Sequence, residues 1–154
     1  MRFEFSAGGI VYKPVRRTQG RKDYLILVAQ HSQHHGWVFP KGLIGDKKEG
    51  EKKEETAIRE VKEETGIDAK IVKPLMPVTY WFVFSSKGRS ASGGKGEKIK
   101  KTVYYFLMEY QGGNMEERDK EMEDVKWIPL SEVETKLTYK SDKQVWQEAQ
   151  KLIE

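Results

Sequence analysis

The segment REVKEETGID contains three glutamates, Glu60, Glu63 and Glu64, in a stretch of five residues. They belong to residues 51–65, a run of good helix formers that Gly66 is placed to end. On a helix, positions i, i+3 and i+4 share one face, so these carboxylates converge. Their repulsion costs free energy unless a cation neutralises it. The spacing therefore predicts a helix with an acidic face that needs a counter-charge.

The alternative interpretation is an ordinary solvated helix face with Lys52, Lys53 and Lys62 as counter-charges. The surroundings of the helix favour a built site instead. Arg59 follows Glu51 by eight residues, which is roughly two helical turns. At that distance the guanidinium can hold the carboxylate in a fixed orientation.

Residues 45–67 together spell G-x5-E-x7-R-E-V-x-E-E-x-G-I, a run of 23 residues with nine specified positions. This run matches the signature of the Nudix (MutT-like) hydrolases at every fixed position, and the chain resembles that family. The segments WVFPKG and VKWIPLSEV also stand where family members carry similar ones. The resemblance implies an α/β (α+β) fold, with a mixed β-sheet sandwiched between helices and the signature forming loop, helix, loop. It also implies an enzyme that hydrolyses a diphosphate linked to another moiety.

A chain of 154 residues is long enough for one domain with a core, and we treat residues 1–154 as a single Nudix hydrolase domain. The stretch 31–50 contains four glycines and is predicted to be mainly loop. The other predicted elements are compatible with the implied fold. They are strands in 6–12, 24–30, 69–86, 100–110 and 124–130, the first two forming a hairpin, and a helix from 141 to the end.

The absence of cysteine excludes disulfides and thiolate metal sites, so a bound metal must be held by oxygen or imidazole. The first residues contain no apolar run long enough for a secretory signal, and no window reaches the roughly 18 residues of a membrane span. The simplest expectation is a cytoplasmic protein. With 28 basic against 24 acidic side chains, the excess charge gives only weak support for phosphate-bearing ligands.

The resemblance implies roles for the acidic face. Glu60, Glu63 and Glu64 are expected to bind Mg²⁺ (or Mn²⁺), and the glutamate that also touches the attacking water would act as base. Arg59 and Glu51 are expected to support them. Hard divalent cations suit this reaction because a pyrophosphate carries dense negative charge that hinders attack by water.

The resemblance implies two further metal ligands. In many members the glycine of PKG is also the first glycine of the signature, whereas here Gly42 precedes Gly45 by three residues, as if three residues were inserted. Which of the two carbonyls faces the metal is open. Family members often add a carboxylate from a loop before the last strand. Glu121 is the expected one, with Glu123 and Glu117 as substitutes.

The segments HHGWVFPKG and KKTVYYFLMEY most resemble the subgroup that cleaves dinucleoside polyphosphates, such as diadenosine tetraphosphate or hexaphosphate. Carried over by position, Lys41 and Lys101 would contact the polyphosphate, His35 would lie near it, and Tyr80 would stack on adenine. Other hydrolase substrates stay open: (deoxy)nucleoside triphosphates, nucleotide sugars, capped RNA and diphosphoinositol phosphates. A non-catalytic nucleotide sensor is disfavoured because every fixed position of the signature is present.

Partners other than a nucleotide receive little support. No groove-reading basic helix is recognisable, which argues against a nucleic-acid-binding module. A monomer and a homodimer are both compatible with the sequence. The segment 87–98 is rich in Gly, Ser and Lys, and its basic residues lead to the hypothesis of a mobile lid over the phosphates, with a disordered surface insertion as the alternative.

Overall fold

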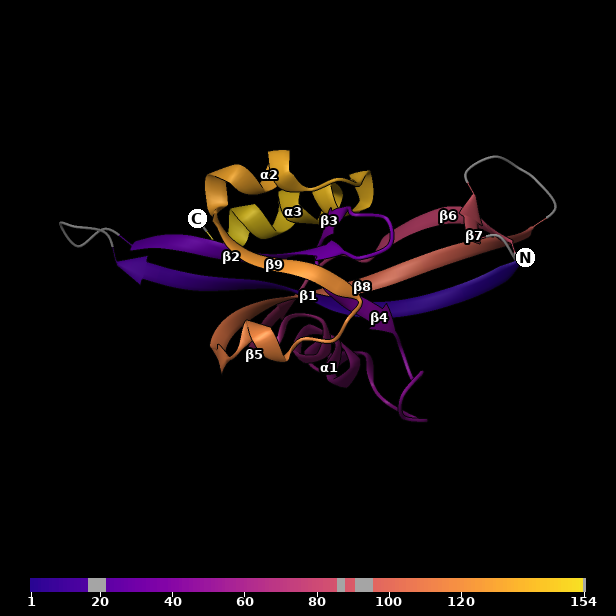
Figure 1. Ribbon diagram of the computed structural model, residues 1–154, viewed down its shortest axis with the longest axis horizontal. Helices are drawn as coiled ribbons and strands as arrows, with labels where there is room; N and C mark the ends of the chain where they lie inside the picture. The colour runs from indigo at the N-terminus through magenta and orange to yellow at the C-terminus, as the bar shows by residue number, and fades with distance from the viewer. Residues whose placement is uncertain (17–21, 86–87, 91–95, 154) are drawn as a thin grey trace.

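A mixed β-sheet with helices on both faces forms the centre of the molecule (Figure 1). The computed structural model describes residues 1–16, 22–85, 88–90 and 96–153, so part of the predicted lid segment 87–98 lies outside the described residues. The strands are β1 (Arg2–Arg16), β2 (Lys22–His31), β3 (Trp37–Val38), β4 (Lys41–Leu43), β5 (Ile67–Pro74), β6 (Val78–Ser85), β7 (Gly88–Ser90), β8 (Glu97–Gly113) and β9 (Met122–Pro129). The helices are α1 (Lys53–Thr65), α2 (Val133–Lys136) and α3 (Lys140–Ile153), with short 3₁₀ turns η1 (Met115–Glu117) and η2 (Leu130–Glu132).

The sheet is mixed because its two longest strands, β1 and β8, pair in parallel from Arg2 opposite Ile99 to Tyr12 opposite Glu109. The strand order is β3-β2-β1-β8-β6-β7, while β9 pairs with β2, β4 with β1 and β5 with β8. β1 and β2 form the predicted antiparallel hairpin. The central pair therefore joins the first strand of the chain to a strand from its second half in one sheet.

Side chains along β1 and β2 alternate between two cores. Ile10 and Ile26 pack in the cluster that contains Trp146 of α3, and their neighbours Val11 and Leu27 pack in the cluster that contains residues of α1. This alternation is what a strand buried on both faces requires. Figure 1 shows α1 below the sheet and α2 and α3 above it, which confirms the expected layers.

Helix α1 confirms the helix predicted over 51–65, and begins two residues later. Ala57 and Val61 are fully buried against the sheet. The helix ends at Gly66, whose left-handed φ of 77° lets its N–H bond the carbonyl of Lys62 at 2.8 Å. The acidic face lies against β4, where Lys41 contacts Glu64 and Gly42 contacts Glu60.

The stretch 31–50 is mainly loop, as predicted, and contains the short strands β3 and β4; β4 pairs with β1 through Gly42 opposite Ala7. Three residues carry no periodicity, so only the distant partner strand makes them a strand. The single predicted strand 69–86 is two strands, because Pro74 and Pro77 interrupt it.

Candidate active site

Arg59 lies at the centre of the acidic face of α1. Its Nε and Nη2 each donate a 2.9 Å hydrogen bond to Glu51, which is the contact that the sequence predicts. Its Nη1 donates to Glu60 at 2.9 Å and to Glu63 at 3.1 Å, and Nη2 also reaches Asp46 at 3.1 Å. One guanidinium therefore fixes the orientation of several carboxylates at once.

The pKa values of two glutamates beside Arg59 are shifted in opposite directions. Hydrogen bonds from Arg59, with a second one from the Thr56 hydroxyl at 2.6 Å, hold the pKa of Glu51 at about 2. Burial raises the pKa of Glu60 to about 7, which Arg59 opposes and the neighbouring charges of Glu63 and Asp46 reinforce. The guanidinium thus compensates Glu51 fully and Glu60 only in part.

Glu64 is the most deeply enclosed of the predicted metal ligands on α1, at 4% exposure. Its Oε2 accepts a 3.0 Å hydrogen bond from the backbone N–H of Lys41. Burial raises the pKa of Glu64 well above its usual range, the positive charge of Lys41 opposes this, and the charges of Glu60 and Glu121 reinforce it. Glu121 is therefore close enough to Glu64 to act on it electrostatically.

Gly42 and Gly45, the two candidates for a carbonyl ligand of the metal, lie in different surroundings. A Cβ atom on Gly42 would lie 2.1 Å from Cδ of Glu60, so any other residue there would have to displace the Glu60 carboxylate. Gly45 instead has a left-handed φ of 78° and hydrogen-bonds through its backbone to Glu51. Gly42 is thus the glycine against the glutamate face, on β4.

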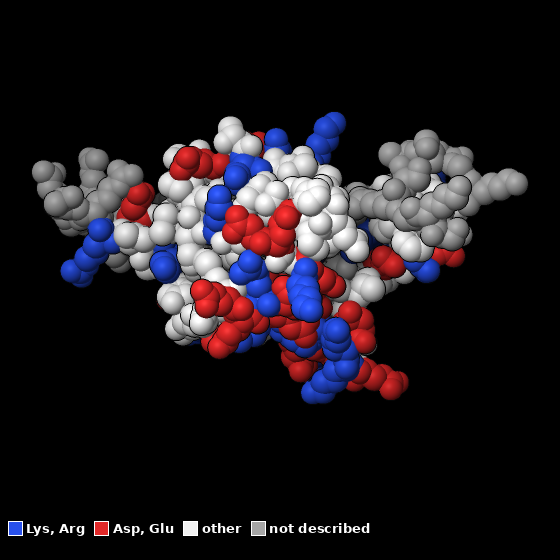
Figure 2. Space-filling view, in the orientation of Figure 1, with Lys and Arg blue, Asp and Glu red and all other residues white. Residues whose placement is uncertain are grey.

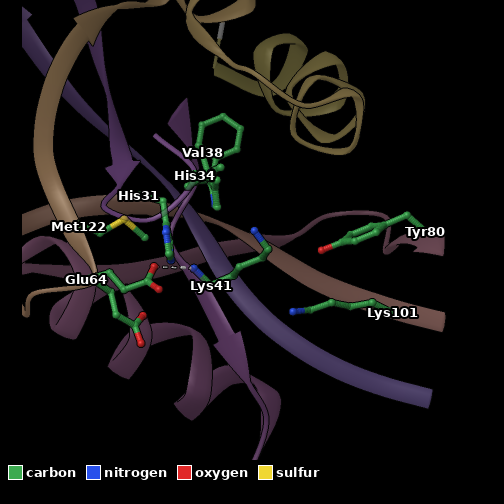
Figure 3. Close-up of a pocket in the computed structure, with 10 residues that line it drawn as sticks. His31, His34, Val38, Lys41, Glu64, Tyr80, Lys101 and Met122 are labelled. Atoms are coloured by element: carbon green, nitrogen blue, oxygen red, sulfur yellow. Dashed lines mark hydrogen bonds between the residues drawn. The ribbon is translucent and has the colours of Figure 1, made fainter. Parts of the chain in front are cut away.

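A pocket with a cavity volume of about 210 Å³ opens beside Glu64. Lys41, Tyr80, Lys101 and Glu121, which the sequence predicted from separate segments, all line it. Figure 3 shows the amino groups of Lys41 and Lys101 and the hydroxyl of Tyr80 directed into the same space. The fold therefore brings two cations and an aromatic ring together next to a buried carboxylate.

Tyr80 and its neighbour Trp81 point to opposite faces of β6. Tyr80 is half-buried against the core and lines the pocket. Trp81 is 48% exposed, with the ammonium groups of Lys98 and Lys100 at 4.7 and 5.3 Å from its ring centre. Of the two aromatic residues, Tyr80 is the one positioned to meet a ligand.

The histidines are arranged differently from the expectation. His35 is not among the residues that line this pocket; its Nδ1 lies 2.5 Å from Glu123, and its φ is 59°. His31 and His34 line the pocket instead, with their rings stacked 4.3 Å apart. His35 has a positive φ and contacts Glu123 outside the pocket, and no sequence pattern in HSQHHG signals this arrangement.

Hydrogen bonds define the tautomers of the two pocket histidines. Nδ1 of His31 accepts from the N–H of Gln33 at 3.1 Å, and Nδ1 of His34 accepts from the N–H of Gly36 at 3.0 Å. A ring nitrogen that accepts a hydrogen bond carries no proton, so the neutral rings are protonated at Nε2. Each ring therefore has an N–H donor on the side opposite its backbone contact.

Comparison with known protein families identifies the family of this chain. The model of the NUDIX domain matches residues 9–149. The chain belongs to the Nudix family. It is accordingly a Nudix hydrolase, and the family is one of pyrophosphohydrolases that generally use divalent metals.

Relatives of this Nudix hydrolase differ in what they are named for. It is 34% identical to the protein MutT4 of Mycobacterium tuberculosis over 155 residues, which cover 98% of this chain and 56% of MutT4. The chain thus spans little more than half of that relative. It is 31% identical to the asymmetrical bis(5'-nucleosyl)-tetraphosphatase of Mus musculus over 132 residues, covering 85% of this chain and 80% of that enzyme.

A solved structure of an Ap4A hydrolase from C. elegans, in a binary complex, has the same Nudix fold. It superposes with a TM-score of 0.70 at 22% identity and covers 97% of both chains. At that identity the likeness establishes the fold alone.

The Nudix donor set suits a hard divalent cation. In the part of the chain that the structure describes, no three acidic or histidine side chains already form a closed ligand group. Glu60 and Glu64 are nonetheless 5% and 4% exposed, and burial raises the pKa of both carboxyl groups. Figure 2 shows acidic side chains gathered over α1. A cation bound here would favour the ionised forms, so the residues fit Mg²⁺ or Mn²⁺.

The three candidates for an additional carboxylate lie in different surroundings. Glu121 lines the pocket with Glu64. Glu123 contacts His35, and Glu117 lies 4.0 Å from the ammonium of Lys62. Glu121 is therefore the candidate that shares the space around Glu64.

Proposed function

We propose that this Nudix hydrolase cleaves a diphosphate bond within a dinucleoside polyphosphate, such as diadenosine tetraphosphate or hexaphosphate. The observation that carries the proposal is the single pocket onto which Lys41, Lys101 and Tyr80 open beside Glu64. Two ammonium groups suit a polyphosphate chain, and a phenol ring suits stacking on a base. The 31% identity to a bis(5'-nucleosyl)-tetraphosphatase supports the same substrate class.

In this proposal Mg²⁺ (or Mn²⁺) is held by Glu60, Glu63 and Glu64, with Glu121 and the carbonyl of Gly42 as further ligands. When bound, such a cation offsets phosphate charge and makes water a better nucleophile. One of the three helix glutamates takes the proton from that water.

We propose that Arg59 and Glu51 hold the glutamates of α1 in fixed orientations. Their paired hydrogen bonds at 2.9 Å hold the guanidinium, and the guanidinium in turn fixes Glu60 and Glu63. We propose that this arrangement preorganises the carboxylates, so that less ordering is needed when metal and substrate bind.

The phosphate chain is proposed to lie along Lys41 and Lys101. The pocket histidines His31 and His34 add N–H donors, and we assign to His34 the part that the sequence assigned to His35. A contact between His35 and substrate stays a prediction, since its side chain meets Glu123. Comparing substitutions of the two histidines separates these assignments.

The test is turnover of a substrate panel with Mg²⁺, with products identified by mass. The panel contains diadenosine polyphosphates, nucleoside triphosphates, a nucleotide sugar, a capped RNA and a diphosphoinositol phosphate, and Glu64→Gln is the matched inactive control. We expect the dinucleotides to be preferred, with ATP among the products. Preference for any other class would overturn the substrate assignment and leave the Nudix chemistry in place.

A cytoplasmic location is part of the same proposal. Among the described residues, none of the helices has the length and apolar character needed to cross a membrane. We further propose that residues 1–154 form one domain, as a monomer or a homodimer.

A further inference from the structure

Tyr139, in the link between α2 and α3, contacts the ring of His34 directly. Its hydroxyl oxygen lies 2.8 Å from Nδ1 of His34, and the two rings meet edge to face with their centres 5.3 Å apart. Nδ1 of His34 also accepts from the N–H of Gly36 at 3.0 Å and so carries no proton, which makes the hydroxyl the donor. Two donors therefore converge on one ring nitrogen.

Gly36 is the residue that lets these two rings meet. A Cβ atom there would lie 2.6 Å from Cε2 of Tyr139 and 2.8 Å from Nδ1 of His34. Both distances are shorter than van der Waals contact, so any other residue would have to displace one of the two rings. The glycine between the histidines and the tryptophan of HHGW thus makes room for a contact across 105 residues of sequence.

The histidine loop, residues 31–36, is closed and anchored by other hydrogen bonds. The N–H of His31 donates to the carbonyl of Gly36 at 3.0 Å, which closes the loop. Directly after it, the N–H of Trp37 donates to the hydroxyl of Thr138 at 2.8 Å, and the N–H of Thr138 donates to the carbonyl of Trp37 at 3.1 Å. Because the backbone of the loop has these supports of its own, removing the tyrosine hydroxyl tests the histidine ring and not the loop.

The ring of His34 joins this outer contact to the pocket. It stacks on His31 with the ring centres 4.3 Å apart and the planes 9° from parallel. Both histidines line the pocket with Glu64 and Lys101, and Tyr139 is not among the lining residues. We therefore expect the tyrosine hydroxyl to affect a ligand through His34, the side chain that it contacts.

We propose that Tyr139 is a positioning residue for this hydrolase, whose hydroxyl keeps the ring of His34 in one orientation and in the tautomer with the proton on Nε2. In that tautomer the ring offers the phosphates a donor. In the other tautomer Nε2 would be an acceptor, which phosphate oxygens repel. This inference rests on the proposed function in assigning a phosphate contact to His34.

The experiment is a double-mutant cycle of Tyr139→Phe and His34→Ala. Phenylalanine keeps the ring beside Gly36 and removes only the hydroxyl. Tyr12→Phe is the matched control, because it removes a tyrosine hydroxyl that donates to Glu109 on β8, at 3.3 Å. Three quantities are measured: kcat and KM separately on the best substrate, the Kd for inorganic tripolyphosphate without metal, and the proton–nitrogen NMR correlation of the His34 imidazole.

Tyr139→Phe is expected to raise KM and the Kd for tripolyphosphate about fourfold, and less than about twofold when residue 34 is already alanine. The value of kcat should stay within about twofold of wild type, because the hydroxyl acts on binding. The NMR spectrum of the wild type should show His34 protonated on Nε2 alone, and Tyr139→Phe should add the Nδ1 tautomer. Tyr12→Phe should change none of the three quantities by more than about twofold.

Equal losses in both His34 backgrounds would show a purely structural role and overturn the proposal. A His34 spectrum that Tyr139→Phe leaves unchanged would overturn it too, and so would a wild-type His34 protonated on Nδ1. If the wild-type chain turns over no substrate of the panel, the proposed function fails, but the spectrum and the tripolyphosphate cycle still decide the role of Tyr139.

Discussion

The backbone N–H of Lys41 donates a 3.0 Å hydrogen bond to Oε2 of Glu64, across 23 residues of sequence. This bond ties β4 to the buried end of the acidic face on α1. It places the lysine expected at the phosphates directly beside a carboxylate expected at the metal. The proposed phosphate contact and the proposed metal ligand are therefore linked through one backbone hydrogen bond.

Glu64→Gln should lower kcat by about a hundredfold or more, because it removes a charge from the proposed metal site. The fold should be unaffected, since glutamine can still accept from the amide of Lys41 and the substitution removes a charge that burial penalises. Steady-state turnover with Mg²⁺ and thermal unfolding of the same preparation measure both effects. A variant with near-wild-type kcat would show that the ligand assignment is wrong.

Gly42→Ala should reduce stability by about 1–3 kcal/mol and turnover by about tenfold or more, because the new methyl group must displace Glu60. Gly50→Ala is the control: φ there is 78°, but no atom lies within 4 Å of the added carbon. It should cost about 1 kcal/mol of backbone strain and leave turnover unchanged. Equal turnover by the two variants would argue against a functional role for the Gly42–Glu60 contact.

The sequence predicts the part of the site that one helix carries. The face shared by Glu60, Glu63 and Glu64 and the pairing of Arg59 with Glu51 follow from 3.6-residue periodicity, which depends only on local geometry. The positions of the main strands along the chain follow similarly from short apolar runs between turn residues.

Other features depend on long-range contacts and could not be predicted in this way. β4 is a strand only because β1 pairs with it, and the parallel pairing of β1 with β8 joins residues that are far apart in sequence. The choice among His31, His34 and His35 depends on the positive φ at His35, which a non-glycine residue adopts rarely. The hydrogen bond from the N–H of Phe39 to Asp142 could not be predicted either, because it depends on where α3 packs.

Tyr80→Leu should raise KM for a dinucleoside polyphosphate by about tenfold, because leucine keeps apolar volume but loses the stacking face. Trp81→Leu is the matched control on the opposite face of β6, where the side chain is 48% exposed, and KM should change by less than about twofold. KM values for both variants, measured on the same substrate, test the prediction. An effect of Trp81→Leu equal to that of Tyr80→Leu would contradict this placement of the base.

His34→Ala should raise KM by about fivefold to tenfold, since it removes an N–H donor from the pocket. His35→Ala should leave KM within about twofold, because it breaks only an exposed contact with Glu123. Steady-state kinetics of both variants on one dinucleotide compare them directly. The reverse order of effects would return the phosphate contact to His35 and require the 31–36 loop to rearrange on binding.

Glu51 should make folding stability depend on acid in a defined window. Its folded pKa of about 2 is below the usual 4.5, so the stabilisation from Arg59 is complete above about pH 4.5 and is lost as the pH falls through about 2. Glu51→Gln should therefore cost about 2–3 kcal/mol at neutral pH, and the difference should narrow only below about pH 4.5.

Urea unfolding of wild type and Glu51→Gln between pH 7 and pH 3 measures this difference. Glu49→Gln, at an exposed position in the same loop, is the control and should have almost no effect at any of these pH values. A Glu51→Gln difference that stays constant down to pH 3 would mean that the carboxylate is not held by Arg59 as the geometry shows. A difference that instead widens as the pH falls from 7 toward 4.5 would indicate a raised pKa, as at Glu60. The narrowing below pH 4.5 therefore tests whether Arg59 stabilises the ionised form of Glu51, as its two hydrogen bonds indicate.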